Sequence, residues 1–283
     1  MADYTWGSPP KRMTAEVFTT LPDSFRTLGS SDHSTNQKRG RPLDSFLEGA
    51  VVVDNKTLYL VDIPYGRIFA VDMATRAWSL VHQYDGEPNG LAWHPQRKQL
   101  IRFNGERLKG PNDVIVGGDG SIYFTDQGMS GLQDPSGRVY RLEQDGRVDV
   151  LLRNCPSPNG LVLDRAGTSL FVAMTRDNSV WHVPLYPDGS VQRTGRFASY
   201  YGIGGPDGMA TDEEGNIFVA HSTLGTVFVH EKNGNPLARI ITSQVGNATT
   251  NLTWGGLENK TLFIVESDSG TILCVEWHCK GRI

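Results

Sequence analysis

The 283-residue sequence lacks the features that mark membrane, secreted and nucleic-acid-binding proteins. No stretch is long and apolar enough to span a bilayer, and residues 1–10 lack the apolar core of a secretory signal. The net charge of −4 provides no basic field for nucleic acid or anionic lipid. We interpret the single dense basic run, residues 38–41, as a solvated linker. We therefore expect neither a nucleic-acid partner nor a membrane partner.

Cysteine is scarce as well, with only three residues in the chain. Their number is odd and their spacing matches no metal motif, which favours a reducing compartment over a disulfide framework. Four Asn-X-Thr sequons point the other way, but without a secretory signal we interpret them as incidental. The sequence therefore favours a cytoplasmic protein and indicates no particular oligomeric state.

What the sequence does contain is a short repeated phrase in which a polar residue precedes Gly or another small turn residue. Its copies lie at residues 88–92, 110–114, 157–161 and 205–209, with a degenerate copy at 249–253 and a first one at 48–51. From Asn112 to Asn159, Asp207 and Asn251 the steps are about 44–48 residues, the period of a four-stranded propeller blade. Repetition around one axis predicts that the Glu, Asn and Asp oxygens meet at one site.

Each phrase is followed by short alternating segments that are separated by turns such as Asp-Gly, the strongest short hairpin signal. This pattern predicts an all-β, six-bladed β-propeller that forms a single domain over residues 1–283. Residues 44–283 would hold the blades, and residues 1–43 would form an N-terminal extension. Within that extension, Glu16–Leu21 is predicted to form a strand that closes the ring on the last blade, because an unclosed ring leaves sheet edges exposed.

One blade is predicted to be short. Between Asn89 and Asn112 there is room for only two strands, at Gly90–His94 and Lys98–Phe103, so the outer two strands are missing. Residues 27–41 are polar and unpatterned, and we expect them to form a loop near the mouth of the channel.

Antiparallel hairpins place the start of the first strand and the end of the second strand at the same end of a blade. The repeated polar residues should therefore share one face of the ring with the residues that end the second strands. Those residues are Asp62, Asp126, Thr175, His221 and Glu266. Of these, Asp126 and His221 are candidate substrate contacts, although each could instead be a structural residue of the pocket wall.

The chain resembles the senescence-marker-protein/gluconolactonase family, whose six-bladed propellers include regucalcin and bacterial and fungal lactonases. The resemblance covers about residues 44–277. The segments that carry it are Leu47-Glu48-Gly49, Pro111-Asn112-Asp113, Tyr123-Phe124-Thr125-Asp126, Pro158-Asn159-Gly160, Gly205-Pro206-Asp207-Gly208 and Val219-Ala220-His221.

The resemblance implies one divalent cation in the channel, held by Glu48, Asn159 and Asp207, with Asn112 as an outer ligand or substrate contact. Such oxygen donors suit Ca²⁺, our first expectation, or Mg²⁺, with Mn²⁺ and Zn²⁺ as further candidates. Taken singly, Asp207 could cap a turn, Asn159 could form a Pro-Asn-Gly turn and Glu48 could be solvated. Their matched blade positions favour the metal-ligand interpretation.

The resemblance also implies a metal-dependent lactonase that hydrolyses a small-molecule lactone to a hydroxy acid, with Asp207 taking a proton from the attacking water. In this interpretation Asn112, Asp126 and His221 contact the substrate. Family members that act on sugar lactones carry Arg at the position of Gly110, so we expect a less hydroxylated lactone here. Candidate apolar walls are Tyr65, Met129, Met174 and Tyr201.

Two other functions remain open at this point. The same scaffold supports non-hydrolytic enzymes of the strictosidine-synthase type, because a fold does not determine a function. The shortened blade also allows a non-enzymatic calcium-binding propeller. Metal-dependent turnover of lactones would separate all three.

Overall fold

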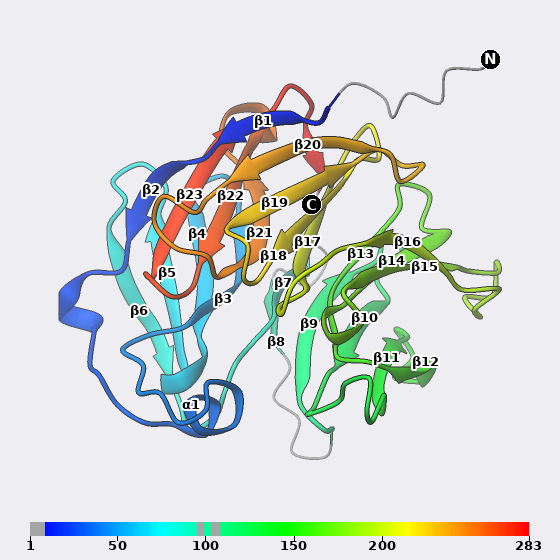
Figure 1. Ribbon diagram of the computed structural model, residues 1–283, viewed down its shortest axis with the longest axis horizontal. Coiled ribbons are helices and arrows are strands. Elements are labelled where there is room, and N and C mark those ends of the chain that lie inside the picture. Colours follow the sequence, from blue (N-terminus) through cyan, green and yellow to red (C-terminus); the bar gives the residue numbers. More distant parts are fainter. Residues whose placement is uncertain (1–8, 95–98, 103–107, 283) are drawn as a thin grey trace.

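Short strands alternate with tight turns along most of the chain. The Asp-Gly turns expected from the sequence put Gly120, Gly146 and Gly189 at φ values of 81°, 90° and 81°, a region that glycine enters at little cost. The computed structural model describes residues 9–94, 99–102 and 108–282, and it is an all-β, propeller-like assembly with almost no helix (Figure 1).

The strands predicted at Glu16–Leu21 and Gly90–His94 are present within one residue of their predicted bounds, whereas both ends of the strand predicted at Lys98–Phe103 lie outside the described residues. In chain order the strands are β1 (Lys11–Thr14), β2 (Glu16–Thr20), β3 (Leu47–Val53), β4 (Thr57–Asp62), β5 (Arg67–Asp72), β6 (Trp78–Gln83), β7 (Leu91–His94), β8 (Gln99–Arg102), β9 (Pro111–Val116), β10 (Ile122–Asp126), β11 (Gly137–Leu142), β12 (Val148–Cys155), β13 (Pro158–Leu163), β14 (Ser169–Met174), β15 (Ser179–Pro184), β16 (Gly195–Ser199), β17 (Pro206–Asp212), β18 (Ile217–His221), β19 (Thr226–His230), β20 (Pro236–Ile241), β21 (Thr249–Gly255), β22 (Thr261–Glu266), β23 (Thr271–Glu276) and β24 (Gly281–Arg282).

These strands form five sheets of four or more strands, which are the blades. Their orders are β3-β4-β5-β6, β9-β10-β11-β12, β13-β14-β15-β16, β24-β17-β18-β19-β20-β1 and β21-β22-β23-β2. Between the first and second of these blades along the chain, the described residues form only the two-stranded sheet β7-β8. Each blade begins with its inner strand. The inner strands β3, β7, β9, β13, β17 and β21 contact one another in turn, and β21 contacts β3, so they surround one axis.

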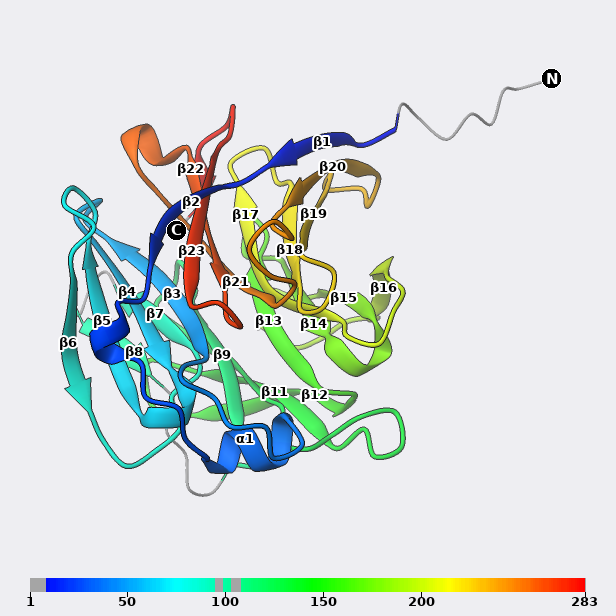
Figure 2. The ribbon, with the colours of Figure 1, turned by 60° about the vertical axis from the view of Figure 1, so that its left-hand side comes forward.

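The N-terminal segment lies along the outside of the last two blades (Figure 2). Strand β2 pairs antiparallel with β23, so the strand expected at Glu16–Leu21 is present and adds to the last blade. Strand β1 pairs with β20 in parallel. These pairings cover two strand edges that would otherwise be open to another chain.

Residues 27–41, expected to form a loop, contain the six-residue helix α1 (Asp32–Gln37). The expectation missed its capping box, in which the side chains of Ser31 and Ser34 each accept the other residue's backbone N–H. The remaining helical turns are 3₁₀ segments: η1 (Asp23–Phe25), η2 (Ile63–Tyr65), η3 (Thr175–Asp177) and η4 (Leu257–Asn259). Among the described residues, no helix has both the length and the apolar character needed to cross a bilayer.

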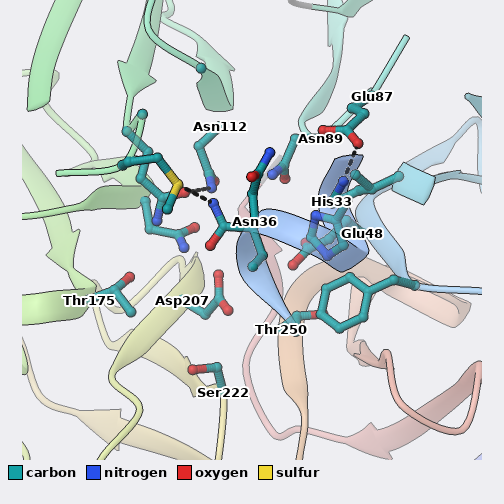
Figure 3. Close-up of a pocket in the computed structure, with 18 of the residues that line it drawn as sticks. His33, Asn36, Glu48, Glu87, Asn89, Asn112, Thr175, Asp207, Ser222 and Thr250 are labelled. Carbon is teal, nitrogen blue, oxygen red and sulfur yellow. Dashed lines mark hydrogen bonds between the residues drawn. The ribbon is translucent and has the colours of Figure 1, made fainter. Parts of the chain in front are cut away.

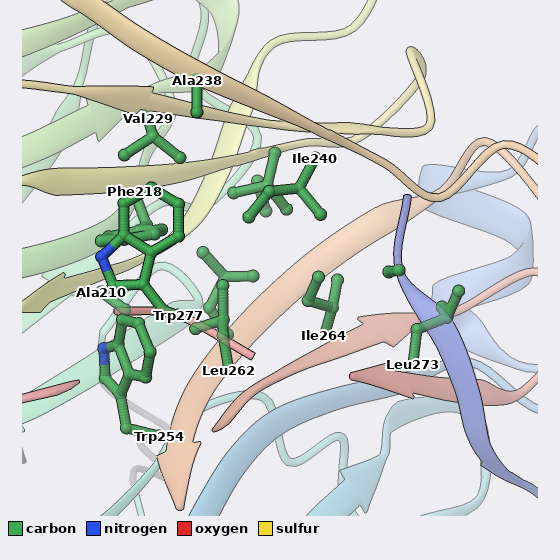
Figure 4. Packing of buried hydrophobic residues seen from close by; sticks show 14 residues of the cluster. Ala210, Phe218, Val229, Ala238, Ile240, Trp254, Leu262, Ile264, Leu273 and Trp277 are labelled. Atoms are coloured by element: carbon green, nitrogen blue, oxygen red, sulfur yellow. The ribbon is translucent and has the colours of Figure 1, made fainter. Parts of the chain in front are cut away.

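The apolar core lies between neighbouring blades. The largest cluster joins the β17–β20 blade to the β21–β23 blade (Figure 4). In it the ring of Phe218 lies 5.1 Å from that of Trp254 and 5.2 Å from that of Trp277, both edge-on. Such edge-to-face pairs add about 0.5–1.5 kcal/mol each to the free energy of burial, so the contact between blades holds the inner strands in place.

Candidate active site

A cavity of about 650 Å³ opens at the end of the ring where the inner strands begin. Each inner strand contributes the residue at or just before its start, and all of these side chains offer an oxygen atom (Figure 3). The six residues are Glu48, Asn89, Asn112, Asn159, Asp207 and Thr250. The repeated phrase of the sequence therefore lines one cavity.

The glycine of the phrase explains how the chain brings these residues so close. A Cβ atom on Gly160 would lie 2.3 Å from the backbone oxygen of Asp207, and one on Gly208 would lie 2.6 Å from that of Thr250. Both distances are shorter than real Cβ contacts, so at these two positions only glycine lets the phrase pack against the next one. A Cβ atom on Gly90 would likewise lie 2.8 Å from the backbone oxygen of Asn112.

The last copy of the phrase is shifted by one residue from the predicted alignment. Thr250, not Asn251, lines the cavity, and Asn251 stands where four of the other five copies have glycine and the copy at Asn112 has Asp113. Its side-chain oxygen accepts the N–H of Leu252 (2.9 Å), and its Nδ2 donates to Oε2 of Glu48 (3.3 Å). Asn251 therefore positions Glu48 from the neighbouring blade.

Carboxylates that end the second strands brace the loops that precede the cavity residues. Each accepts the backbone N–H of the residue two positions before a cavity residue. The bonds are Phe46 N–H to Asp62 (2.7 Å), Gly110 N–H to Asp126 (2.8 Å) and Ala248 N–H to Glu266 (2.9 Å). Asp126 is thus buried behind the site, and its predicted contact with substrate is corrected to a bracing role. The cavity is lined instead by its neighbour, Gln127.

The structure also places His221 outside the cavity lining. Its imidazole is fully buried between the rings of Tyr200 and Phe228, and its Nε2 lies 3.3 Å from Oδ1 of Asn178. Burial lowers the pKa of His221 to about 4. The following residue, Ser222, is the one that borders the cavity. The sequence located the correct strand end, but the side chain of His221 packs between its own blade and the preceding one.

The two buried carboxylates of the cavity, Glu48 and Asp207, form an electrostatic pair. Glu48 and Asp207 are 5 % and 7 % exposed. Burial, together with the charge of Asp207, raises the pKa of Glu48 well above its usual value. Burial, with a further contribution from Asp113, raises the pKa of Asp207 to about 7. Two buried carboxylates that oppose each other's ionisation are stabilised by a shared cation.

The amides around this pair are held by hydrogen bonds that leave oxygen atoms free. The side chain of Asn159 hydrogen-bonds to Asp207. Nδ2 of Asn112 donates to Oε1 of Gln127 (2.9 Å), and Nε2 of Gln127 donates to Ser157 (2.7 Å). Because Asn112 uses its nitrogen for Gln127, its oxygen remains available to a cation or a substrate. This set of oxygen donors fits Ca²⁺ or Mg²⁺.

Helix α1 brings residues that the sequence analysis did not assign to the site. Asn36 and His33 lie among the strand residues in Figure 3, and Nε2 of His33 is buried without a hydrogen-bond partner. The His33 N–H donates to Oε1 of Glu87 (2.5 Å), which fixes the helix to the loop before β7. Lys38, in the run interpreted as a solvated linker, lines the cavity, so that interpretation was wrong for this residue.

The walls of the cavity are mostly polar. Of the four apolar wall candidates only Met129 lines it. The hydroxyl of Tyr65 donates to the backbone oxygen of Leu43, Met174 is fully buried and Tyr201 is 86 % exposed, so these three residues do not form walls.

A second acidic group lies at the other end of β17 from the cavity residue Asp207. Asp212, Glu214 and Cys279 bring potential metal-binding atoms within 4.8 Å of one another. Both oxygens of Asp212 are already used, since they accept hydrogen bonds from Asn216 and from Nε1 of Trp277. The paired carboxylates of the cavity are the better candidate for a cation.

Comparison with known proteins identifies the family. The model of the SMP-30/gluconolactonase/LRE-like region matches residues 101–268. The chain belongs to this family. Solved structures with a similar fold include regucalcin from Agrobacterium tumefaciens, described as a calcium-binding protein. That structure covers 98 % of each chain at a TM-score of 0.74 and 19 % identity, which reflects a shared fold.

Two curated relatives from the same comparison carry lactonase names. Gluconolactonase from Zymomonas mobilis is 31 % identical over 222 residues, which are 72 % of this chain and 59 % of that protein. Lactonase drp35 from Staphylococcus aureus is 33 % identical over 226 residues, 69 % of each chain. The match thus spans less than two thirds of the first relative and just over two thirds of the second.

Proposed function

We propose that this chain is a lactonase that opens a cyclic ester to a hydroxy acid with the help of one divalent cation. The lactonase assignment is supported by family membership and by the names of the curated relatives. The proposed cation is supported mainly by the buried pair Glu48 and Asp207, which lies among amide and hydroxyl oxygens at the start of the inner strands.

We assign Glu48, Asn159 and Asp207 as the residues that hold the cation, and Asn112 as an outer ligand or substrate contact. Calcium is our first choice, because the donors are all oxygen atoms and a calcium-binding protein shares the fold. When bound, a divalent cation supplies Lewis-acid polarisation of an ester carbonyl. Asp207 takes a proton from the water that attacks this carbonyl, and Asn112 orients the lactone.

We further propose that the two-stranded sheet β7-β8 is the sixth, truncated blade of a single propeller domain. The support is that β7 contacts both β3 and β9 and so occupies one place in the ring of inner strands. Asn89 precedes β7 and lines the cavity as its counterparts do in the other blades. Loss of the outer strands therefore leaves intact the inner strand β7 and Asn89, which are the part of this blade that borders the site.

The test is hydrolysis of a panel of lactones by chelated protein to which Ca²⁺, Mg²⁺, Mn²⁺ or Zn²⁺ is returned. We expect turnover only with cation, and calorimetry should show one site that is lost in Asp207→Ala. Asp188→Asn, in an exposed turn, is the matched control. Cation binding without turnover of any lactone would favour a calcium-binding propeller, and cation-independent chemistry would favour the strictosidine-synthase type.

A further inference from the structure

Two positively charged side chains in the cavity have no carboxylate partner. Lys38 and Arg176 both line the cavity, yet neither takes part in an ion pair within the described part of the chain. The third cation of the lining, Lys109, donates its Nζ to the backbone oxygen of Ser136 (3.2 Å) and is thereby turned to the rim. Lys38 and Arg176 are thus the cavity cations that remain free to bind a ligand.

Lys38 is held in place from two sides. It directly follows helix α1, and its Nζ lies 3.8 Å from the ring centroid of Phe46, which also lines the cavity. The side chain is half-buried, and its charge interacts with those of Asp207 and Glu48. Arg176 approaches from the 3₁₀ turn after β14, and its charge acts on Asp207 as well. Both cations therefore border the side of the cavity occupied by Asp207.

The charges of the site leave these two cations uncompensated once a divalent cation is bound. Glu48 and Asp207 together balance a charge of +2. The other carboxylates of the lining are Glu87, which accepts the N–H of His33, and Asp32, which is exposed on α1. Asp268, whose charge also reaches Lys38, is paired with Arg41, and Arg176 is exposed at the cavity. A ligand anion that enters the cavity can neutralise both Lys38 and Arg176.

We propose that Lys38 and Arg176 form a carboxylate-binding subsite, and that the lactone opened by this enzyme carries a carboxylate beside its ring. This inference rests on the proposed lactonase function. An ammonium and a guanidinium on one side of the scissile ester are suited to a carboxylate, because each contributes a charge-assisted hydrogen bond. The mostly polar lining agrees with such a substrate better than with the apolar lactone expected from Gly110.

The test compares 5-oxotetrahydrofuran-2-carboxylate with its methyl ester, which has the same ring but no charge. In the first reaction water adds to the lactone carbonyl and the ring C–O bond breaks, which gives 2-hydroxyglutarate and one proton. We expect kcat/KM for the acid to exceed that for the ester by about tenfold or more, mainly through KM. This preference should fall as ionic strength rises.

Substitutions of Lys38 and Arg176 test whether these residues cause the preference for the acid over the ester. Lys38→Met should bring the ratio of the acid to the ester close to one, Lys38→Arg should retain most of it, and Arg176→Gln should reduce it. Lys109→Met, which changes another cavity lysine, should leave the ratio as it is. Calorimetry with 2-hydroxyglutarate, on chelated and on metal-loaded protein, should show weaker binding to the Lys38→Met variant.

The possible outcomes separate the two proposals. Equal turnover of acid and ester, or an unchanged ratio in Lys38→Met, would overturn the anionic substrate while leaving the lactonase function in place. 4-Hydroxybutyrate is the product of an uncharged lactone, and its carboxylate is created by hydrolysis. If Lys38→Met weakens inhibition by 4-hydroxybutyrate but leaves the ratio of acid to ester unchanged, Lys38 binds the carboxylate of the product. That result would also exclude an anionic substrate. Absence of lactone hydrolysis with every cation would refute the lactonase function, and calorimetry would still test the subsite.

Discussion

Replacing Asp207 by Asn should stabilise the metal-free protein at high pH and destabilise the metal-loaded protein. Asp207 is buried, and its pKa in the fold is raised to about 7 by that burial, with Asp113 adding to the effect. A carboxyl whose pKa is higher in the folded state than in the unfolded chain favours folding while it is protonated. This contribution is complete below about pH 4 and is lost as the pH rises through about 7.

The magnitude follows from the difference between 3.8 and about 7 in the pKa of this carboxyl. Each pKa unit corresponds to 1.36 kcal/mol, so ionisation of Asp207 costs the metal-free fold roughly 4 kcal/mol at pH 8. Asn has nearly the same shape and does not ionise. We therefore expect chelated Asp207→Asn to exceed the wild type in free energy of unfolding by about 2–4 kcal/mol at pH 8. At pH 4 the two proteins should be nearly equal.

Urea unfolding followed by tryptophan fluorescence measures these free energies, at both pH values, with chelator and with excess CaCl₂. With calcium the order should reverse at pH 8, because the wild type gains binding free energy that the variant lacks. Asp188→Asn controls for the loss of one negative charge. If chelated wild type is more stable than Asp207→Asn at pH 8, Asp207 is not an uncompensated buried charge and the case for the cation site loses its basis.

Three further substitutions test the scaffold around the site. Arg67→Met should lower the free energy of unfolding by about 3–5 kcal/mol in urea, because it leaves the fully buried Asp62 without its ion-pair partner; an effect below 1 kcal/mol would contradict this. Gly160→Ala should weaken calcium binding in calorimetry at least tenfold, since its Cβ would displace the backbone of Asp207, whereas Gly195→Ala, with open space around it, should have no effect. Phe218→Ala should lower the thermal midpoint through a loss of about 3–5 kcal/mol in the core between blades, and an unchanged midpoint would argue against that packing.

The sequence was sufficient to locate the inner strands and four of the six inner-strand residues that line the cavity. A polar residue followed by glycine, repeated at blade spacing, favours both a turn and a close approach between blades. The structure shows the close approach at Asn159-Gly160 and Asp207-Gly208, but both pairs lie at irregularities within strands β13 and β17 and do not form turns. The copy at Thr250-Asn251 was misaligned by one residue, because Asn251 matches the chemistry of the motif while occupying the glycine position.

Side-chain direction was harder to predict than strand position. Asp126 and His221 both end second strands at the expected face, but local pairing decides where each points. Asp126 turns to the N–H of Gly110, and His221 packs against Tyr200, which follows β16 of the preceding blade. Neither partner is close in sequence, so the spacing of residues contains no signal for these contacts.

Helix α1 and Lys38 were missed for a related reason. A helix of six residues has little stability of its own, because its few hydrogen bonds do not offset the unfavourable free energy of helix nucleation. It is stabilised by a serine capping box and by Glu87, 54 residues away from His33. The capping residues were visible in the sequence, whereas the tertiary contact was not, and Lys38 takes its place in the cavity from that contact.

The unequal chemistry of the six phrases supports the charge assigned to the site. A perfect repeat would place six identical side chains around the axis, and six carboxylates would repel one another strongly in a buried cavity. The chain instead presents two carboxylates, three amides and one hydroxyl. Glu48 and Asp207 start strands β3 and β17, which are separated in the ring only by β21, so their charges lie toward one side. The proposed divalent cation would balance both charges on that side, and the amides of Asn89 and Asn112 would remain for the substrate.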